Sequence, residues 1–158
     1  MIRGIADKFG ASPTADDRKK RSTMYLEWAA EYDVGVESID NQHRLLVQHI
    51  NEIHDNLRDG DPSETVLVSF DKMAFHTSEH FRHEEELSEK TKYPGAVHHA
   101  RKHRELEELL QRFGLVLGRL DGPTAIADQL TFLRIWLLDH IQKEDKALAE
   151  HLNRLNIF

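Results

Sequence analysis

The chain has 158 residues, a formal net charge of −7 at neutral pH and no cysteine. This length suits one domain with a sizeable core. The acidic balance argues against nucleic acid as a partner, because phosphate binding needs a basic face. The absence of cysteine excludes disulfides, thiolate zinc sites and iron–sulfur clusters. No apolar run reaches the ~18 residues that a membrane span needs, so we expect no membrane segment and a cytoplasmic location.

Residues 1–23 differ from the rest of the chain. Ile2, Ile5, Ala6 and Phe9 recur at helical spacing, but the apolar run is too interrupted for the core of a signal peptide. A polar linker follows. We therefore expect an N-terminal extension over residues 1–23, which is either a flexible tail or a docking element for a partner or for a second copy. The remaining residues, 24–158, form the predicted domain.

Glycine and proline divide this domain into four long segments. They cluster in three turns, over residues 58–62, 92–95 and 120–123. Apolar residues recur at spacings of three and four between the turns, as amphipathic helices require. The expected helices cover approximately residues 40–57, 63–91, 96–119 and 123–155. Because short turns make neighbouring helices antiparallel, the fold class is all-α, an up-down-up-down four-helix bundle with an N-terminal arm.

Seven candidate metal ligands lie on these helices. His80 and Glu84 are four residues apart, as are His99 and His103, so each pair shares one helix face. His43 and His80 are 37 residues apart across a turn, and so are His103 and His140. Counting ~1.5 Å per residue from the turns places these four histidines at one level of the bundle. The complete predicted set is His43, His80, Glu84, His99, His103, His140 and Asp145.

These side chains are predicted to hold two metal ions. Buried without a partner, each would cost several kcal/mol, and seven ligands are too many for one tetrahedral zinc. Imidazoles with carboxylates suit iron. Two six-coordinate ions with two bridging carboxylates and a bridging solvent oxygen would leave one position open for a small ligand such as dioxygen. His140 and Asp145 lie ~140° apart on a regular helix, so they do not share one face. We therefore expect either that Asp145 approaches the site from the layer above or that the helix contains a local π-bulge.

The chain resembles the hemerythrins, specifically the bacterial single-domain hemerythrins, from about residue 26 to about residue 155. The matching motifs are Trp28, Val34-Gly35, Ile39-Asp40-x-Gln42-His43, His80-Phe81-x-x-Glu84-Glu85, Tyr93-Pro94 with His99-x-x-x-His103, and Trp136-Leu137-x-x-His140-x-x-x-x-Asp145.

The resemblance implies a non-haem centre of two iron ions with a bridging oxygen. One iron would be held by His99, His103 and His140 and the other by His43 and His80, with both carboxylates bridging. It also implies reversible dioxygen binding at the two-histidine iron, and an arm around Trp28 that folds over the centre. The chain is then an oxygen-binding protein for transport, storage or buffering, and not an enzyme.

Three other functions stay open. One is an oxygen or redox sensor that acts through a partner, the second is a di-iron enzyme that reduces peroxide or nitric oxide, and the third is iron storage. A ferritin-like centre is disfavoured because no Glu-x-x-His motif is present.

Further residues are assigned by helical phase. Leu46, Phe81 and Trp136 are candidates for an apolar pocket around the metals, and His76 is a candidate hydrogen-bond donor to His80. Most of the remaining histidines and the acids Glu85 and Glu86 are expected to be solvated.

Overall fold

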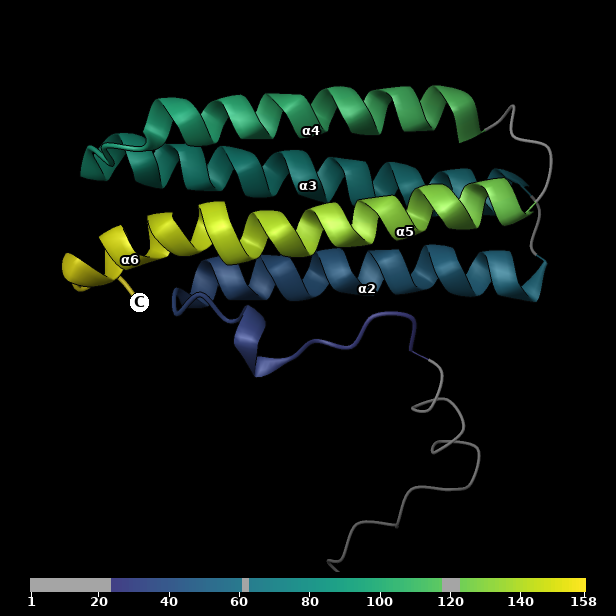
Figure 1. The fold of residues 1–158 in the computed structure, drawn as a ribbon, viewed down its shortest axis with the longest axis horizontal. Helices are drawn as coiled ribbons and strands as arrows, with labels where there is room; N and C mark the ends of the chain where they lie inside the picture. Colours follow the sequence, from purple (N-terminus) through teal and green to yellow (C-terminus); the bar gives the residue numbers. More distant parts are fainter. Residues whose placement is uncertain (1–23, 61–62, 118–122) are drawn as a thin grey trace, which may run out of the picture.

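A computed structural model describes residues 24–60, 63–117 and 123–158. Four long helices dominate these residues (Figure 1): α2 (Glu37–Asp59), α3 (Ser63–Thr91), α4 (Ala96–Leu117) and α5 (Pro123–His140). A π-helical turn, η2 (Ile141–Asp145), joins α5 to the short final helix α6 (Lys146–Arg154). A 3-10 turn, η1 (Ala30–Tyr32), precedes α2. No helix in the described ranges is both long and apolar enough to cross a membrane.

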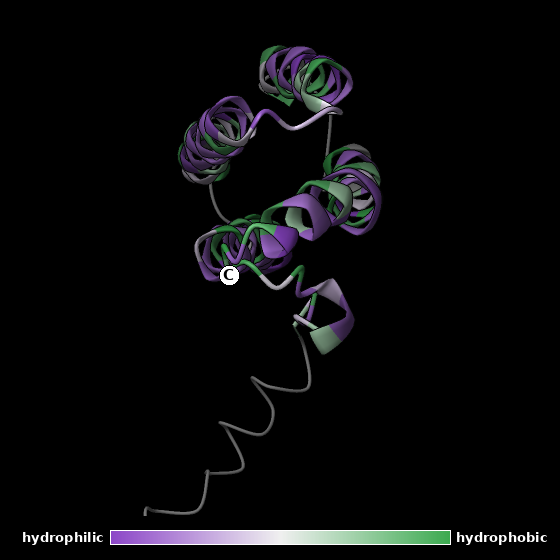
Figure 2. Ribbon diagram, turned by 90° about the vertical axis from the view of Figure 1, so that its left-hand side faces the viewer, coloured by the Kyte–Doolittle hydropathy of each residue, from purple (hydrophilic) through white to green (hydrophobic). Residues whose placement is uncertain are grey.

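The four long helices form an antiparallel bundle, which confirms the predicted fold class. Viewed along their axes they occupy the corners of a square (Figure 2). Helix α2 lies beside α3 and α5, and α3 lies beside α4. Apolar side chains from every long helix and from α6 fill the interior, among them Ile39, Ile53, Phe70, Phe113, Leu130 and Leu148.

The predicted helix limits agree with the structure to within about three residues. Helix α2 ends where Gly60 adopts a left-handed conformation with φ of 73°, and the Gly60 N–H donates to the carbonyls of Asn56 and Leu57. Glycine reaches this conformation without a steric penalty. The predicted turn over residues 120–123 falls mostly outside the described residues.

A π-helical turn interrupts the last long helix. Residues 141–145 follow the wider i→i+5 pattern before the α-helix resumes at Lys146. This is one of the two arrangements predicted from the five-residue spacing of His140 and Asp145. Both side chains consequently face the interior, at 4% and 0% exposure.

The segment before α2 is fixed to the bundle as an arm. Asn51 on α2 accepts a hydrogen bond from the Leu26 N–H and donates one to the Leu26 carbonyl, both at 2.8 Å. The Asp40 carboxylate accepts hydrogen bonds from the N–H groups of Val34 and Gly35. These bonds hold the arm against the end of the bundle that carries His43.

Replacing Asn51 with alanine is expected to destabilise the protein. The change leaves the amide and carbonyl of Leu26 without their buried partners, which costs about 1–3 kcal/mol. Urea unfolding should show this loss. Asn41→Ala is the matched control, because Asn41 is exposed and, among the described residues, its side chain hydrogen-bonds only the Arg44 guanidinium. A loss below about 0.5 kcal/mol for Asn51→Ala would mean that the arm is not anchored through this residue.

Candidate metal centre

All seven predicted ligands converge in the interior of the bundle. None is more than 4% exposed to solvent. They come from α2, α3, α4 and α5 and from η2, so every long helix contributes. Their ligand atoms form two groups in which all atoms lie within 4.8 Å of one another: Glu84, His99, His103, His140 and Asp145 in the first, and His43, His80, Glu84 and Asp145 in the second. Both carboxylates belong to both groups.

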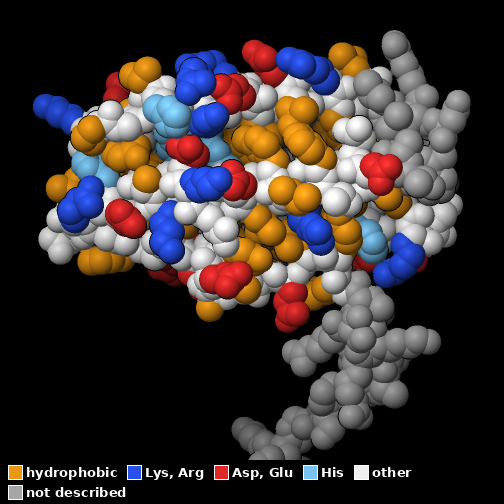
Figure 3. All heavy atoms as spheres, in the orientation of Figure 1, with side chains coloured by type: hydrophobic (Ala, Val, Ile, Leu, Met, Phe, Trp, Pro, Cys, Tyr) orange, Lys and Arg blue, Asp and Glu red, His pale blue; other side chains and the backbone are white. Residues whose placement is uncertain are grey.

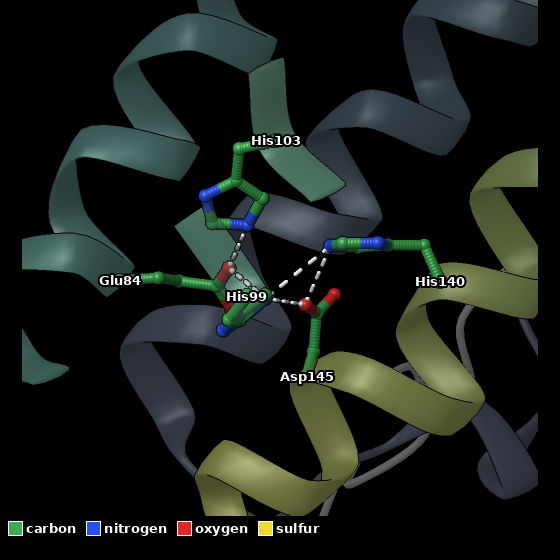
Figure 4. A group of neighbouring side chains, drawn as sticks. All are labelled: Glu84, His99, His103, His140 and Asp145. Carbon is green, nitrogen blue, oxygen red and sulfur yellow. Dashed lines mark hydrogen bonds and ion pairs between the residues drawn. The ribbon is translucent and has the colours of Figure 1, made fainter. Parts of the chain in front are cut away.

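Asp145 links the two groups through its two oxygens. Its Oδ1 lies 2.9 Å from Nε2 of His99 and 3.0 Å from Nε2 of His140. Its Oδ2 lies 3.0 Å from Nε2 of His43, on the other side. Figure 4 shows this carboxylate entering the first group from the last helical segment, opposite Glu84. The π-helical turn therefore places Asp145 between histidines of three different helices.

Glu84 on α3 also lies between the two groups of histidines, on the side opposite Asp145 (Figure 4). Its Oε2 lies 3.2 Å from Nε2 of His103 and 3.6 Å from Nε2 of both His80 and His99. Neither of its oxygens makes a hydrogen bond. A buried carboxylate without a hydrogen-bond donor is strongly disfavoured, so these oxygens fit a cation.

The outer nitrogens of two histidines show which way their lone pairs point. Nδ1 of His80 lies 3.0 Å from Oε1 of Gln42, and Nδ1 of His103 lies 2.9 Å from Oε1 of Glu85. Both partners are acceptors, so each Nδ1 carries the proton and each Nε2 presents a lone pair to the centre. Neither Nε2 has a hydrogen-bond partner. Metal-binding histidines are oriented in this way.

Burial sets the protonation of these groups. It lowers the pKa of His80 well below its usual value and that of His103 to about 2, so both imidazoles are neutral at neutral pH. Burial, together with the charge of Asp145, raises the pKa of Glu84 well above its usual value. Burial also acts to raise the pKa of Asp145, but attraction and hydrogen bonding by His140, with hydrogen bonds from His43 and His99, hold it well below the usual value.

Aromatic rings cover the histidines. Phe81 stacks on His103 with ring centroids 3.9 Å apart, and Trp136 stacks on His140 at 4.9 Å. Trp28 of the arm stacks on His43 at 6.1 Å. The contacts expected for Phe81 and Trp136 are thus present, and the arm covers the centre.

A small cavity of about 20 Å³ lies beside the four histidines that share one level. Leu46, Thr77, Leu106 and Leu137 line it, and each is three residues from one of these histidines. Such a volume has room for about one water molecule. Its wall is otherwise apolar, with Ile50, Met73, Leu110, Leu133 and Trp136 completing it.

Residues beside the ligands make contacts that helical phase did not predict. Glu85 is exposed, as expected, and it also accepts a hydrogen bond from His103. His76, a candidate donor to His80, stacks on His49 instead, and Gln42 lies at hydrogen-bonding distance from His80. His49 is buried at 9% exposure. Helical phase within one helix could not predict these contacts, because each of them joins α3 to α2 or to α4.

Residues 34–152 match the family described as the hemerythrin HHE cation binding domain. This chain belongs to the hemerythrin family. It is 32% identical over 134 residues to the bacteriohemerythrin of Stenotrophomonas maltophilia, covering 82% of this chain and 85% of the relative. It is 29% identical to the bacteriohemerythrin of Methylococcus capsulatus, covering 77% and 92%.

A solved structure shares the hemerythrin fold. A crystal structure of wild-type hemerythrin superposes with a TM-score of 0.72 at 24% identity, covering 81% of this chain and 98% of that chain. The myohemerythrin of Sipunculus nudus is 27% identical over 75% of this chain and 86% of its own length. Family membership implies a non-haem iron centre, and the cluster of histidines and carboxylates is where this chain could hold metal.

Proposed function

We propose that the seven residues bind two iron ions and that the loaded centre binds dioxygen reversibly. The observation that carries the proposal is the sharing of Glu84 and Asp145 between two groups of histidines. Two carboxylates that each face both groups suit two ions side by side. Imidazole and carboxylate are ligands that suit iron. The iron pair, when bound, would supply the two electrons that dioxygen takes up and returns.

The two groups differ in the number of histidines. His99, His103 and His140 would hold one ion, and His43 and His80 the other, with the carboxylates common to both. The ion with two histidines has one protein ligand fewer and is therefore the expected place for dioxygen. Trp28 stacks on His43 at this position.

The surroundings of the centre favour binding over turnover. The described residues that line the cavity include no carboxyl, imidazole or amine. Thr77, the one hydroxyl among them, donates to the carbonyl of Met73 at 2.8 Å. Reduction of peroxide or nitric oxide needs protons delivered to the ligand, and this wall offers no titratable group to deliver them. We infer a carrier, store or buffer of dioxygen, in the cytoplasm.

The test is to reduce the loaded protein without air and to follow its visible absorption while dioxygen is admitted and then removed. We expect two irons per chain and an absorption band that appears with dioxygen and disappears on its removal. Immediate irreversible oxidation would contradict reversible binding and favour a redox sensor. Steady consumption of peroxide or nitric oxide with a reductant would favour an enzyme, and uptake of many more than two irons would favour storage.

A further inference from the structure

Helix α5 carries apolar side chains on the face that points away from the bundle. Phe132 is 50% exposed and Ile135 is 58% exposed, and half-buried Trp136 and Leu138 adjoin them. We call these four residues the outer α5 patch. The face of a surface helix opposite the core is normally polar. Hydrophobic side chains gather on both sides of α5 in the space-filling view (Figure 3).

This patch adjoins the metal centre and has acidic borders. Trp136 stacks on His140, so anything that covers the patch lies one side chain from a candidate ligand. Asp128 and Asp139 are exposed on the same side of α5, and Asp139 also pairs with Lys143 at 2.6 Å. A segment that combines apolar side chains with positive charge would complement this surface.

The described chain begins beside the patch. The hydroxyl of Tyr25 lies 3.0 Å from the hydroxyl of Thr131, next to Phe132 in sequence, and the Arg134 guanidinium lies 4.9 Å above the Tyr25 ring. Asn51 fixes the next residue, Leu26. Residues 1–23 are therefore attached to the molecule at a point that already touches α5.

The sequence of residues 1–23 matches this surface. Ile2, Ile5 and Phe9 are spaced by three and four residues, so they would share one face of a helix. Six basic and three acidic side chains give the segment a net charge of +3, whereas the whole chain carries −7. We propose that residues 2–9 cover the outer α5 patch of the same chain, with Ile2, Ile5 and Phe9 against Phe132 and Ile135.

A second copy of the chain fits the patch less well. A second copy would bring a chain of net charge −7 to a face that already exposes Asp128 and Asp139, whereas residues 1–23 carry a net charge of +3. The chain's own segment is favoured by its tether as well as by its charge. A tether within one chain produces an effective concentration in the millimolar range, and the 14 residues from 10 to 23 are long enough to span up to about 50 Å.

Because the protein contains no cysteine, a pair of introduced cysteines can test the contact. The variant is the full chain with Phe9→Cys and Ile135→Cys, exposed to a mild oxidant. We expect an intramolecular disulfide in a monomer, seen by non-reducing electrophoresis and by mass spectrometry of the linked peptides. Ile135 is more than half exposed, so its replacement leaves the core intact.

The matched control carries the same two cysteines together with Ile2→Asp and Ile5→Asp. Its tether and its cysteines are unchanged, but the apolar stripe is lost, so the disulfide should form at least about tenfold more slowly. Equal rates would show only random collisions of the segment and would overturn the proposal. A disulfide-linked dimer would also overturn it and would assign the patch to a second copy. Neither result depends on bound metal or on dioxygen.

Discussion

Asp145→Ala is expected to empty both proposed metal positions, lowering bound iron from the proposed two per chain to less than about 0.5. Loss of a group that merely hydrogen-bonds a metal ligand costs about 10–100-fold in affinity. Asp145 contacts histidines of both groups directly, at 2.9 to 3.0 Å. We therefore expect at least ~100-fold weaker binding at both positions. Iron per chain after loading and desalting is the measurement.

The neighbouring residue provides the control for this change. Glu144 lies in the same π-helical turn, but its carboxylate points outward to Nε2 of His98 at 3.3 Å. Glu144→Ala should retain two irons. Circular dichroism should give the same helical content for both variants. Retention of two irons by Asp145→Ala would disprove the sharing of this carboxylate.

Glu84→Gln is expected to change stability in opposite directions with and without metal. In the metal-free protein the carboxylate faces the Nε2 lone pairs of His80 and His103 and accepts no hydrogen bond. A glutamine amide in the same place can donate to these nitrogens. Replacing a buried carboxylate that lacks a hydrogen-bond partner with an amide that has one should increase the free energy of unfolding by about 1–3 kcal/mol at about pH 8.

The gain should depend on pH. Burial raises the pKa of Glu84 in the folded chain, so the folded state binds a proton more strongly than the unfolded state does. Stability is therefore lost as pH rises from the unfolded pKa towards the folded one. The advantage of Glu84→Gln should be small at about pH 5 and larger at about pH 8, in urea unfolding with a chelator present.

Ferrous iron should reverse the comparison. A ligand that binds only the folded state adds about 4 kcal/mol at 1,000 times its dissociation constant, and Glu84→Gln should lose most of this gain. Glu85→Gln is the control, because the glutamine oxygen can still accept the hydrogen bond from His103. A Glu84→Gln variant that is less stable than the parent chain without metal would show that Glu84 supports the bundle by itself.

Local patterns in the sequence predicted most of the fold and all seven side chains that converge at the candidate metal centre. The three clusters of glycine and proline located the helix ends because these residues cannot continue a helix at low cost. Pairs spaced by four, such as His80 with Glu84, share a face by the geometry of one helix. Equal distances from the turns placed histidines of different helices at one level. Each of these arguments needs only one helix, or two helices joined by a short turn.

Other features depend on how the helices rotate and shift against one another. The sequence left two arrangements open for Asp145, and the packing of the last helix selected the π-helical turn. The bonds of Gln42 to His80 and of Glu85 to His103 span 38 and 18 residues, which no helical period reports. The stack of Trp28 on His43 requires an arm that is held in place because its N–H groups donate hydrogen bonds to Asn51 and Asp40. The sequence by itself thus determined which seven candidate ligands converge, because helical periodicity is local. Only the tertiary structure decided how each imidazole is oriented and covered, because those contacts join distant segments.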